Sequence, residues 1–149
     1  MKKCLVRALL LLVILSGTMG AALAGGAAPD KSPALSEQKA KAALESLREA
    51  YQRGDLEAFM RGVSEQAGFN RLEFKMAIAD RFTRQSSFEL VFVTDHAVAE
   101  TDWLSLKVHW DRRAVRKDTG ETELAEGKAE LLFKGEEAKL FDIRGDSPF

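Results

Sequence analysis

The hydrophobic pattern of this chain changes its period once, near Phe88, and that change limits the fold more than any other feature of the sequence. Before Phe88, apolar residues recur at i, i+3 and i+7, which is the spacing of one helix face. After it they alternate with polar residues, as in a strand that is buried on one side. A run of helices followed by a run of strands predicts an α+β fold with an antiparallel sheet.

Three helices are expected before the change of period. The helical pattern of the first starts at Ser36, and Gly54 stops this helix because glycine accepts the positive φ that a helix stop uses. Asp55 is a favourable N-cap for a short second helix, and Asn70 is one for a third helix that ends at Ser86-Ser87. The apolar residues of the third helix cover a wide arc, so this helix is expected to be buried on more than one side.

The expected strands are Phe88–Val93, continued by Ala97–Ala99, then Leu104–Trp110, Ala125–Phe133 and Lys139–Ile143. Asp118-Thr119-Gly120 has the composition of a hairpin turn between the second and third of them. The segments Phe88–Val93 and Leu131–Phe133 carry apolar residues on both faces. Such a sheet needs two covers, one from the helices and one from something else, and the pattern therefore predicts self-association through the sheet.

The first 24 residues have the three parts of a secretory signal. A basic start with Lys2, Lys3 and Arg7 precedes an apolar run over residues 8–15, and Ala22-Leu23-Ala24 supplies small residues for cleavage. The apolar run is too short for a membrane span of about 20 residues. We expect a signal peptide over residues 1–24 that is cleaved after Ala24, with an uncleaved anchor as the alternative, then a Gly-, Ala- and Pro-rich leader over 25–34 and one domain over 35–149. The location is then secreted or periplasmic, without stable membrane insertion after cleavage.

Composition excludes several classes of function. Lys and Arg number 22 and Asp and Glu 23, so no basic surplus supports nucleic-acid binding, and the 46% of hydrophobic residues is too high for a disordered chain. Cys4 is the only cysteine and precedes the apolar run, so neither a lipid anchor, a disulfide nor a thiolate metal site is expected. Two histidines do not make a His-rich metal site unless carboxylates supply the other ligands. We expect no metal and no cofactor.

The order of elements, together with two segments, resembles the nuclear transport factor 2-like superfamily. The segments are Leu47–Phe59, which reads LREAYQRGDLEAF, and the closing Ala138–Asp146, which reads AKLFDIRGD. The resemblance covers Leu35 to Asp146. It implies three N-terminal helices packed on a curved antiparallel sheet, the cone also described as cystatin-like, with a pocket between helices and sheet. Between Phe59 and Asn70 this chain is shorter than many relatives, which have an additional strand pair there.

The same resemblance implies isomerase- and dehydratase-like enzymes as well as non-catalytic binding modules, so the fold alone does not settle the function. In isomerase-like members a carboxylate base works with an oxyanion hole that contains a tyrosine. Counted from the shared Gly-Asp pair, the tyrosine position falls on Leu47 and the base position on Arg71. Neither residue has that chemistry, and Tyr51 lies one helical turn beyond Leu47.

Asp95, His96 and Asp102 are the residues to inspect for acid-base chemistry. Asp95 and His96 are adjacent, and adjacent strand residues point to opposite faces, which argues against a direct Asp-His pair. His109 lies on the polar face of its strand, where a solvated histidine or a rim position is expected. The basic cluster from Arg112 to Lys117 is expected to face Glu121, Glu123 and Glu126 across the hairpin; the alternative is a phosphate or anionic-surface patch.

The expected ligand pocket is lined by six residues: Tyr51, Phe74, Ile78, Phe82, Trp103 and Leu106. For Trp103 the alternative is that it fills core or sheet-interface space. The sequence thus predicts an exported, non-catalytic binding or interaction module with an apolar pocket, which forms a homodimer and binds no nucleic acid. The alternative is a small isomerase, dehydratase or cyclase that uses a pocket carboxylate or histidine.

Overall fold

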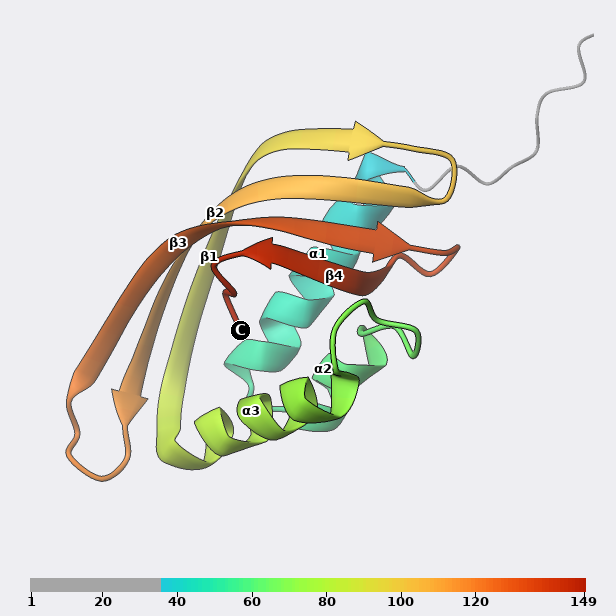
Figure 1. Ribbon diagram of the computed structural model, residues 1–149. Helices are drawn as coiled ribbons and strands as arrows, with labels where there is room; N and C mark the ends of the chain where they lie inside the picture. Colours follow the sequence, from blue (N-terminus) through green and yellow to red (C-terminus); the bar gives the residue numbers. More distant parts are fainter. Residues whose placement is uncertain (1–35) are drawn as a thin grey trace, which may run out of the picture. The chain divides into compact units, whose positions relative to one another are not determined.

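The computed structural model describes residues 36–149, in which three helices precede four strands (Figure 1). The elements are α1 Glu37–Gln52, α2 Leu56–Arg61, α3 Arg71–Arg84, β1 Gln85–Ala99, β2 Trp103–Arg116, β3 Thr122–Lys134 and β4 Lys139–Gly145. The predicted α+β class is confirmed. The predicted signal peptide and leader, residues 1–24 and 25–34, lie outside the described residues. None of the helices within residues 36–149 is both long and apolar enough to cross a membrane.

The second and third helices begin at the capping residues that the sequence indicates, and Ser36 caps the first. The side chain of Ser36 accepts a hydrogen bond from the backbone N–H of Lys39, and Asp55 accepts one from Ala58 at 2.9 Å. The Asn70 Oδ1 accepts from two backbone N–H groups, those of residues 72 and 73. Each cap satisfies N–H groups that have no partner inside the helix. At the other end of α1, Gly54 has a φ of +67°, as its predicted role as a stop requires.

The third helix differs from its prediction in burial and in length. Ile78 is its only buried residue, whereas Leu72 and Met76 are 67% and 63% exposed. The helix packs mainly on α2 and β1, and within the described residues the side of its apolar arc that carries Leu72 and Met76 is left largely uncovered. It also ends at Arg84, and β1 begins at once, before the Ser86-Ser87 pair that was expected to end the helix.

The four strands form one antiparallel sheet in the order β1-β2-β3-β4. The hairpin turns contain Gly120 and Gly135, which have positive φ of +73° and +76°. Register shifts interrupt β1 between Ser86 and Glu89 and again between Thr94 and His96. Bulges increase the local twist and bend a strand, and the long strands curve over the helices (Figure 1).

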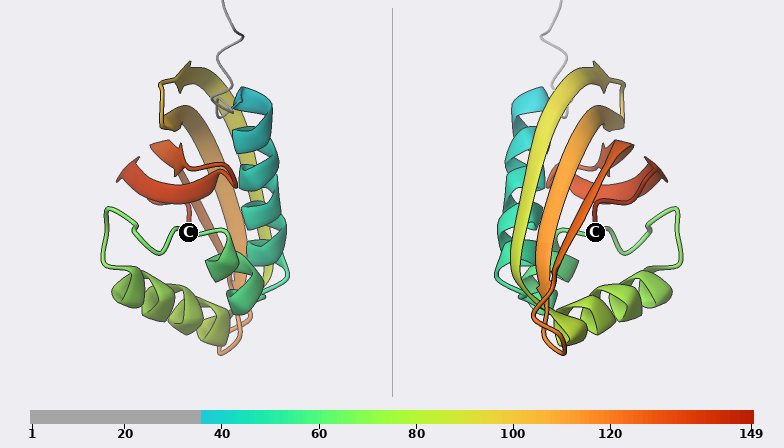
Figure 2. Two further views of the ribbon diagram at one scale, coloured as in Figure 1. Left: turned by 90° about the vertical axis from the view of Figure 1, so that its right-hand side faces the viewer. Right: turned by 90° about the vertical axis from the view of Figure 1, so that its left-hand side faces the viewer.

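The hydrophobic core lies between the concave face of the sheet and the helices, with α1 running along that face (Figure 2). The even-numbered residues of β2 that the sequence assigns to the buried face, Leu104, Leu106, Val108 and Trp110, are all buried. The segment between α2 and α3 adds only one isolated bridge, from Val63 to Leu140. This bridge stands where the resemblance expects an additional strand pair in many relatives.

The outer face of the sheet is only partly as predicted. Val91 and Val93 of β1 are 52% and 56% exposed, so nothing within residues 36–149 covers this part of the face. Leu132, however, is buried, and so is its cross-strand neighbour Ser105, which donates a hydrogen bond to Glu130 at 2.5 Å. The expectation that Leu131–Phe133 needs a cover from outside is therefore wrong for Leu132, because the chain itself already shields that end of the face.

Candidate functional site

Tyr51, in the last turn of α1, is the centre of an aromatic cluster beneath the concave face of the sheet. Its side chain is fully buried. Four phenylalanine rings lie with their centroids within 6.0 Å of the Tyr51 ring: Phe59, Phe82, Phe88 and Phe149. They come from α2, α3, β1 and the segment after β4. The three helices, β1 and the segment after β4 therefore each contribute a ring to the interior at this point.

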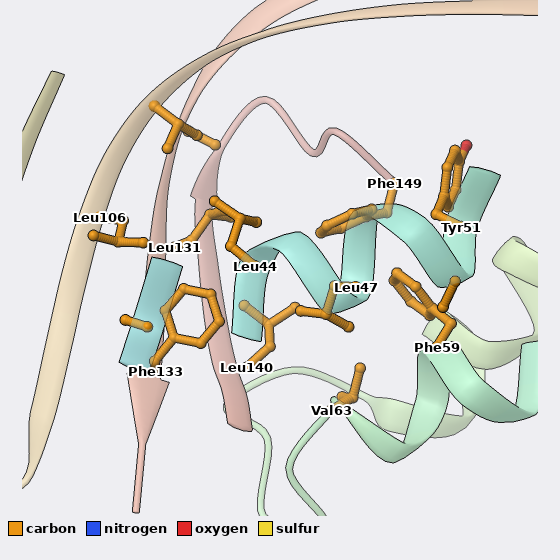
Figure 3. Packing of buried hydrophobic residues seen from close by; sticks show 14 of the residues in the cluster. Leu44, Leu47, Tyr51, Phe59, Val63, Leu106, Leu131, Phe133, Leu140 and Phe149 are labelled. Carbon is orange, nitrogen blue, oxygen red and sulfur yellow. The ribbon is translucent and has the colours of Figure 1, made fainter. Parts of the chain in front are cut away.

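The segment after β4 enters this interior (Figure 3). Phe149 is only 4% exposed, and its ring lies 4.9 Å from that of Phe59 and 5.9 Å from that of Phe92, measured between centroids. Two side chains of β2 bind the main chain of the segment: the Trp110 Nε1–H donates to the Asp146 carbonyl at 2.9 Å, and the Arg112 Nη1 donates to the Pro148 carbonyl at 3.1 Å. An aromatic ring of the chain itself thus fills space between the helices and the sheet.

Two guanidinium groups approach the hydroxyl of Tyr51. The Arg81 Nη1 lies 3.4 Å from the Tyr51 Oη. Burial lowers the pKa of Arg112, while the nearby Tyr51 hydroxyl raises it and the positive charge of Arg81 lowers it further. Glu123 has the smallest of these effects on the pKa of Arg112. Within the described residues neither Arg81 nor Arg112 forms an ion pair with a carboxylate. The site therefore carries positive charge next to aromatic rings.

Four of the six predicted pocket residues lie close to this cluster. Phe82 contacts Tyr51 directly, with ring centroids 5.3 Å apart, and Phe74 lies 6.0 Å from Phe59. Ile78 is buried beneath them in α3. Tyr51 and Phe59, which contact Phe82 and Phe74, also contact the ring of Phe149, so aromatic rings of the chain itself lie among these residues.

The other two predicted pocket residues belong elsewhere. Leu106 is a core residue of the concave face, beside Leu131 (Figure 3). Trp103 is half-buried and stands an odd number of residues from Leu106 on a regular strand, which places it on the opposite face of the sheet. The same alternation puts Trp110 inside, where it is buried.

The three candidate acid-base residues lie outside the core. Asp95, His96 and Asp102 are all exposed, the first two on β1 and the third in the β1–β2 turn. Asp95 and His96 do not pair with each other, as the adjacency argument predicts. Asp95 instead contacts His109 of β2, with 2.5 Å between its Oδ2 and the histidine Nδ1.

The sequence analysis did not predict the Asp95–His109 contact, because the contact joins two neighbouring strands at a β-bulge. Residue 95 is the extra residue of β1 between Thr94 and His96, and the register around it brings its side chain to the neighbouring strand. A shallow groove of about 290 Å³ lies beside the contact. Its other polar lining residues are Lys107, Lys128, Glu130 and Arg144.

The basic residues around the β2–β3 turn do not form one surface patch, because each binds different partners. Arg116 pairs with Asp118 at 2.6 Å and with Glu123 across the hairpin at 3.8 Å, as the interpretation of a charge-paired hairpin expects. Arg113, by contrast, pairs with Glu89 of β1, and Arg112 turns into the interior. Arg112 and Ala114 are spaced by two on β2 and share its inner face, so the alternation of the strand separates Arg112 from the surface group.

The positions that correspond to the isomerase pattern have structural roles. Leu47 is buried in the core. Arg71 donates from Nη2 to the Met60 carbonyl at 3.2 Å and pairs with Glu65 at 3.0 Å, so it joins α3 to the preceding segment. Among residues 36–149, no Asp, Glu or His is buried, and no group of three or more metal-ligating side chains is assembled.

Solved structures share this architecture over most of their length. A conserved protein from Planctomyces limnophilus matches with a TM-score of 0.66 and 15% identity, over 74% of this chain and 97% of that one. A ketosteroid isomerase-like protein from Erwinia carotovora atroseptica matches with a TM-score of 0.59 and 16% identity, over 74% and 96%. A nuclear transport factor 2-like superfamily protein from Salmonella enterica matches with a TM-score of 0.60 and 11% identity, over 75% and 90%.

Further matches are described as a candidate polyketide cyclase, a candidate hydroxylase and a candidate dehydratase, and one as a protein of unknown function. No family model matches the chain, and no curated protein does. At these identities the matches establish a shared fold and leave the chemistry of the site to be argued from its own residues.

Proposed function

With the nuclear transport factor 2-like fold as the architecture of this chain, we propose that it is an exported, non-catalytic binding and interaction module. It takes an apolar ligand between its helices and its sheet, and it forms a homodimer through the outer face of the sheet. The first 24 residues, with their basic start and apolar run, support export.

One observation carries the binding function: the interior is aromatic, and the acid-base candidates are outside it. Tyr51 and the rings around it form an apolar, aromatic interior between the helices and the sheet. Asp95 and His96 are exposed residues of β1 and lie outside this aromatic interior. General acid-base catalysis needs such a group within hydrogen-bond reach of a bound substrate. A site formed by phenylalanine rings, the Tyr51 phenol and the guanidinium groups of Arg81 and Arg112 is instead suited to binding a ligand.

A second observation supports the homodimer. Val91 and Val93 are more than half exposed and neighbour each other on the outer face of β1, and Leu124 of β3 is also exposed. The same face carries both signs of charge, with Lys107 and Lys128 beside Glu130. In a two-fold dimer each patch meets a copy of itself, so it must be self-complementary. Apolar residues flanked by mixed charges meet this requirement.

Replacing Val93 by Lys is expected to convert the dimer to a monomer, because it buries two unpaired ammonium groups in a two-fold interface. Sedimentation velocity of the full chain at micromolar concentration measures this. Leu72→Lys is the matched control: Leu72 is also exposed and apolar but lies on α3, and its variant is expected to stay dimeric. A wild-type chain that sediments as a clean monomer contradicts the dimer.

The binding function is tested against the enzyme alternative by native mass spectrometry of the protein purified from its own compartment. The expected spectrum shows the dimer and the mass of any retained ligand. That ligand, incubated with fresh protein, is expected to be recovered chemically unchanged. A product of different mass would support the isomerase, dehydratase or cyclase alternative instead.

A further inference from the structure

The segment Asp146–Phe149 lies where a ligand of the proposed binding module would bind. It has no regular structure after β4, and within the described residues one main-chain hydrogen bond, from the Asp146 N–H to the Lys128 carbonyl, joins it to the sheet. Two of its carbonyl oxygens accept hydrogen bonds from side chains of β2, and the ring of Phe149 lies beside Phe92 of β1. These are the contacts that a small molecule with an oxygen acceptor and a ring could also make.

The ring of Phe149 defines the apolar half of this site. Its neighbours Tyr51, Phe59 and Phe92 approach it with centroid distances between 4.9 and 5.9 Å, in tilted or edge-on arrangements. These are the distances and orientations that aromatic pairs prefer. If Phe149 leaves, it uncovers a space of the size and shape of one six-membered ring.

The donors around the segment define the polar half. Trp110 and Arg112 donate to main-chain carbonyl oxygens, and Arg81 reaches the hydroxyl oxygen of Tyr51. Guanidinium groups prefer carboxylate acceptors, with which they form shorter and stronger hydrogen bonds than with neutral oxygens. The charges that face this point are those of Arg81 and Arg112, with Glu123 as the weak opposing one. Glu123 itself is bound by Arg116 and Gln85.

We propose that the space held by Pro148-Phe149 is a binding site for a carboxylate with an aromatic ring, and that the segment is an internal occupant which such a ligand displaces. The ring of the ligand takes the place of the Phe149 ring, and its carboxylate accepts from Arg81, Arg112 and the Tyr51 hydroxyl. The inference rests on the proposed binding function and adds to it the class of ligand and the competition with the chain itself.

The competition has a measurable consequence. Because the site is open only in the fraction of molecules whose segment is displaced, the apparent affinity of the wild type is reduced by that fraction. Removing the ring while keeping the chain length, in Phe149→Ala, is expected to raise the affinity for 3-phenylpropanoate at least about tenfold. Isothermal titration calorimetry of the full chain measures it.

A pair of probes tests the charge. The neutral 3-phenylpropan-1-ol has the same ring and linker as 3-phenylpropanoate and lacks the carboxylate. Phe149→Ala is expected to bind the acid at least about tenfold more tightly than the alcohol, because charge-assisted hydrogen bonds are roughly twice as strong as neutral ones. Equal affinity for the two probes overturns the carboxylate assignment and leaves an apolar ligand, and with it the proposed function, standing.

A pair of arginine variants tests the position of the charge. Arg81→Gln, added to Phe149→Ala, is expected to remove most of the preference for the acid. Arg84→Gln is the matched control: Arg84 lies on the same helix but is 73% exposed and pairs with Asp80. An equal loss in both double variants shows a nonspecific charge effect and overturns the role of Arg81.

Displacement of the Pro148-Phe149 segment can also be observed in the wild type, without a substitution that weakens the core. In the wild type, NMR resonances of a labelled Phe149 ring are expected to move toward those of an exposed phenylalanine as 3-phenylpropanoate saturates. Binding of the acid with unchanged Phe149 resonances overturns the displacement, and no binding to either wild type or a folded Phe149→Ala overturns the site. The dimer, measured separately by sedimentation, is unaffected by any of these results.

Discussion

Replacing Phe59 by Ala is expected to lower the free energy of unfolding by about 3–5 kcal/mol. Phe59 is fully buried and stands between Tyr51, Phe74 and Phe149. Truncation removes the transfer free energy of the ring and leaves a cavity. Its neighbours come from α1, α3 and the segment after β4, so no single element can move to fill the gap.

Urea denaturation with a fixed slope measures the loss for Phe59→Ala. Leu72→Ala is the control, because Leu72 is a large apolar residue with most of its side chain in water, and its variant is expected to stay within about 0.5 kcal/mol of the wild type. If Phe59→Ala costs no more than Leu72→Ala, the helices do not pack on the aromatic cluster in the way described here.

Gly145→Ala is expected to be the second most disruptive change, lowering the free energy of unfolding by about 3 kcal/mol. Two costs add at this position. Gly145 has a φ of +88°, which strains any residue with a Cβ. A Cβ there would also lie 2.7 Å from the backbone carbonyl oxygen of Lys128, an atom that cannot move without breaking the sheet. Because Gly145 ends β4, the same change is expected to disturb the path of Phe149 into the interior.

Gly135→Ala separates these two costs. Gly135 has a similar φ of +76°, but nothing lies within 4 Å of the place its Cβ would take. Its variant carries the backbone strain alone, about 1–2 kcal/mol. Equal losses of stability in the two variants, by urea denaturation, would show that the close approach to Lys128 contributes nothing.

Features that depend on neighbouring residues in the sequence were predicted well. Asp55 and Asn70 cap the helices that follow them, and Gly54 ends α1, because a cap is a contact between residues at most a few positions apart. The alternation from Leu104 to Trp110 identified the buried face of β2 for the same kind of reason. Strand geometry alone puts every second residue on one side.

Errors arose where burial depends on a partner element. The apolar residues of α3 form a wide arc, but the elements that pack on this helix leave Leu72 and Met76 largely in water. The opposite error concerns Leu132, which was expected to need a cover from outside the chain: it lies on the outer face of the sheet and is already buried. A hydrophobic pattern reports which residues favour burial, and only the packing of elements decides which of them obtain it.

In the candidate site, too, the residues on local patterns were predicted and those placed by tertiary packing were missed. Tyr51, Phe74, Ile78 and Phe82 were predicted together because they lie on apolar stripes of helices that must face a sheet. Phe149 and Arg112 were missed as parts of the site. Phe149 reaches the interior through a turn after β4 that no local pattern announces, and Arg112 stands in a run of charged residues that suggests a solvent-exposed hairpin.

By itself the sequence determined the α+β class, the starts of the helices and the buried face of the central strand, because each depends on dihedral preferences and on spacing within about ten residues. Only the tertiary structure decided what fills the space around Tyr51, which acid His109 contacts, and which apolar residues stay exposed. These depend on contacts such as Trp110 to Asp146 and Arg81 to Tyr51, between residues about 30 or more positions apart. Such contacts form only where the curvature of the sheet and the path of the last segment bring the residues together, and a periodic pattern carries no information about either.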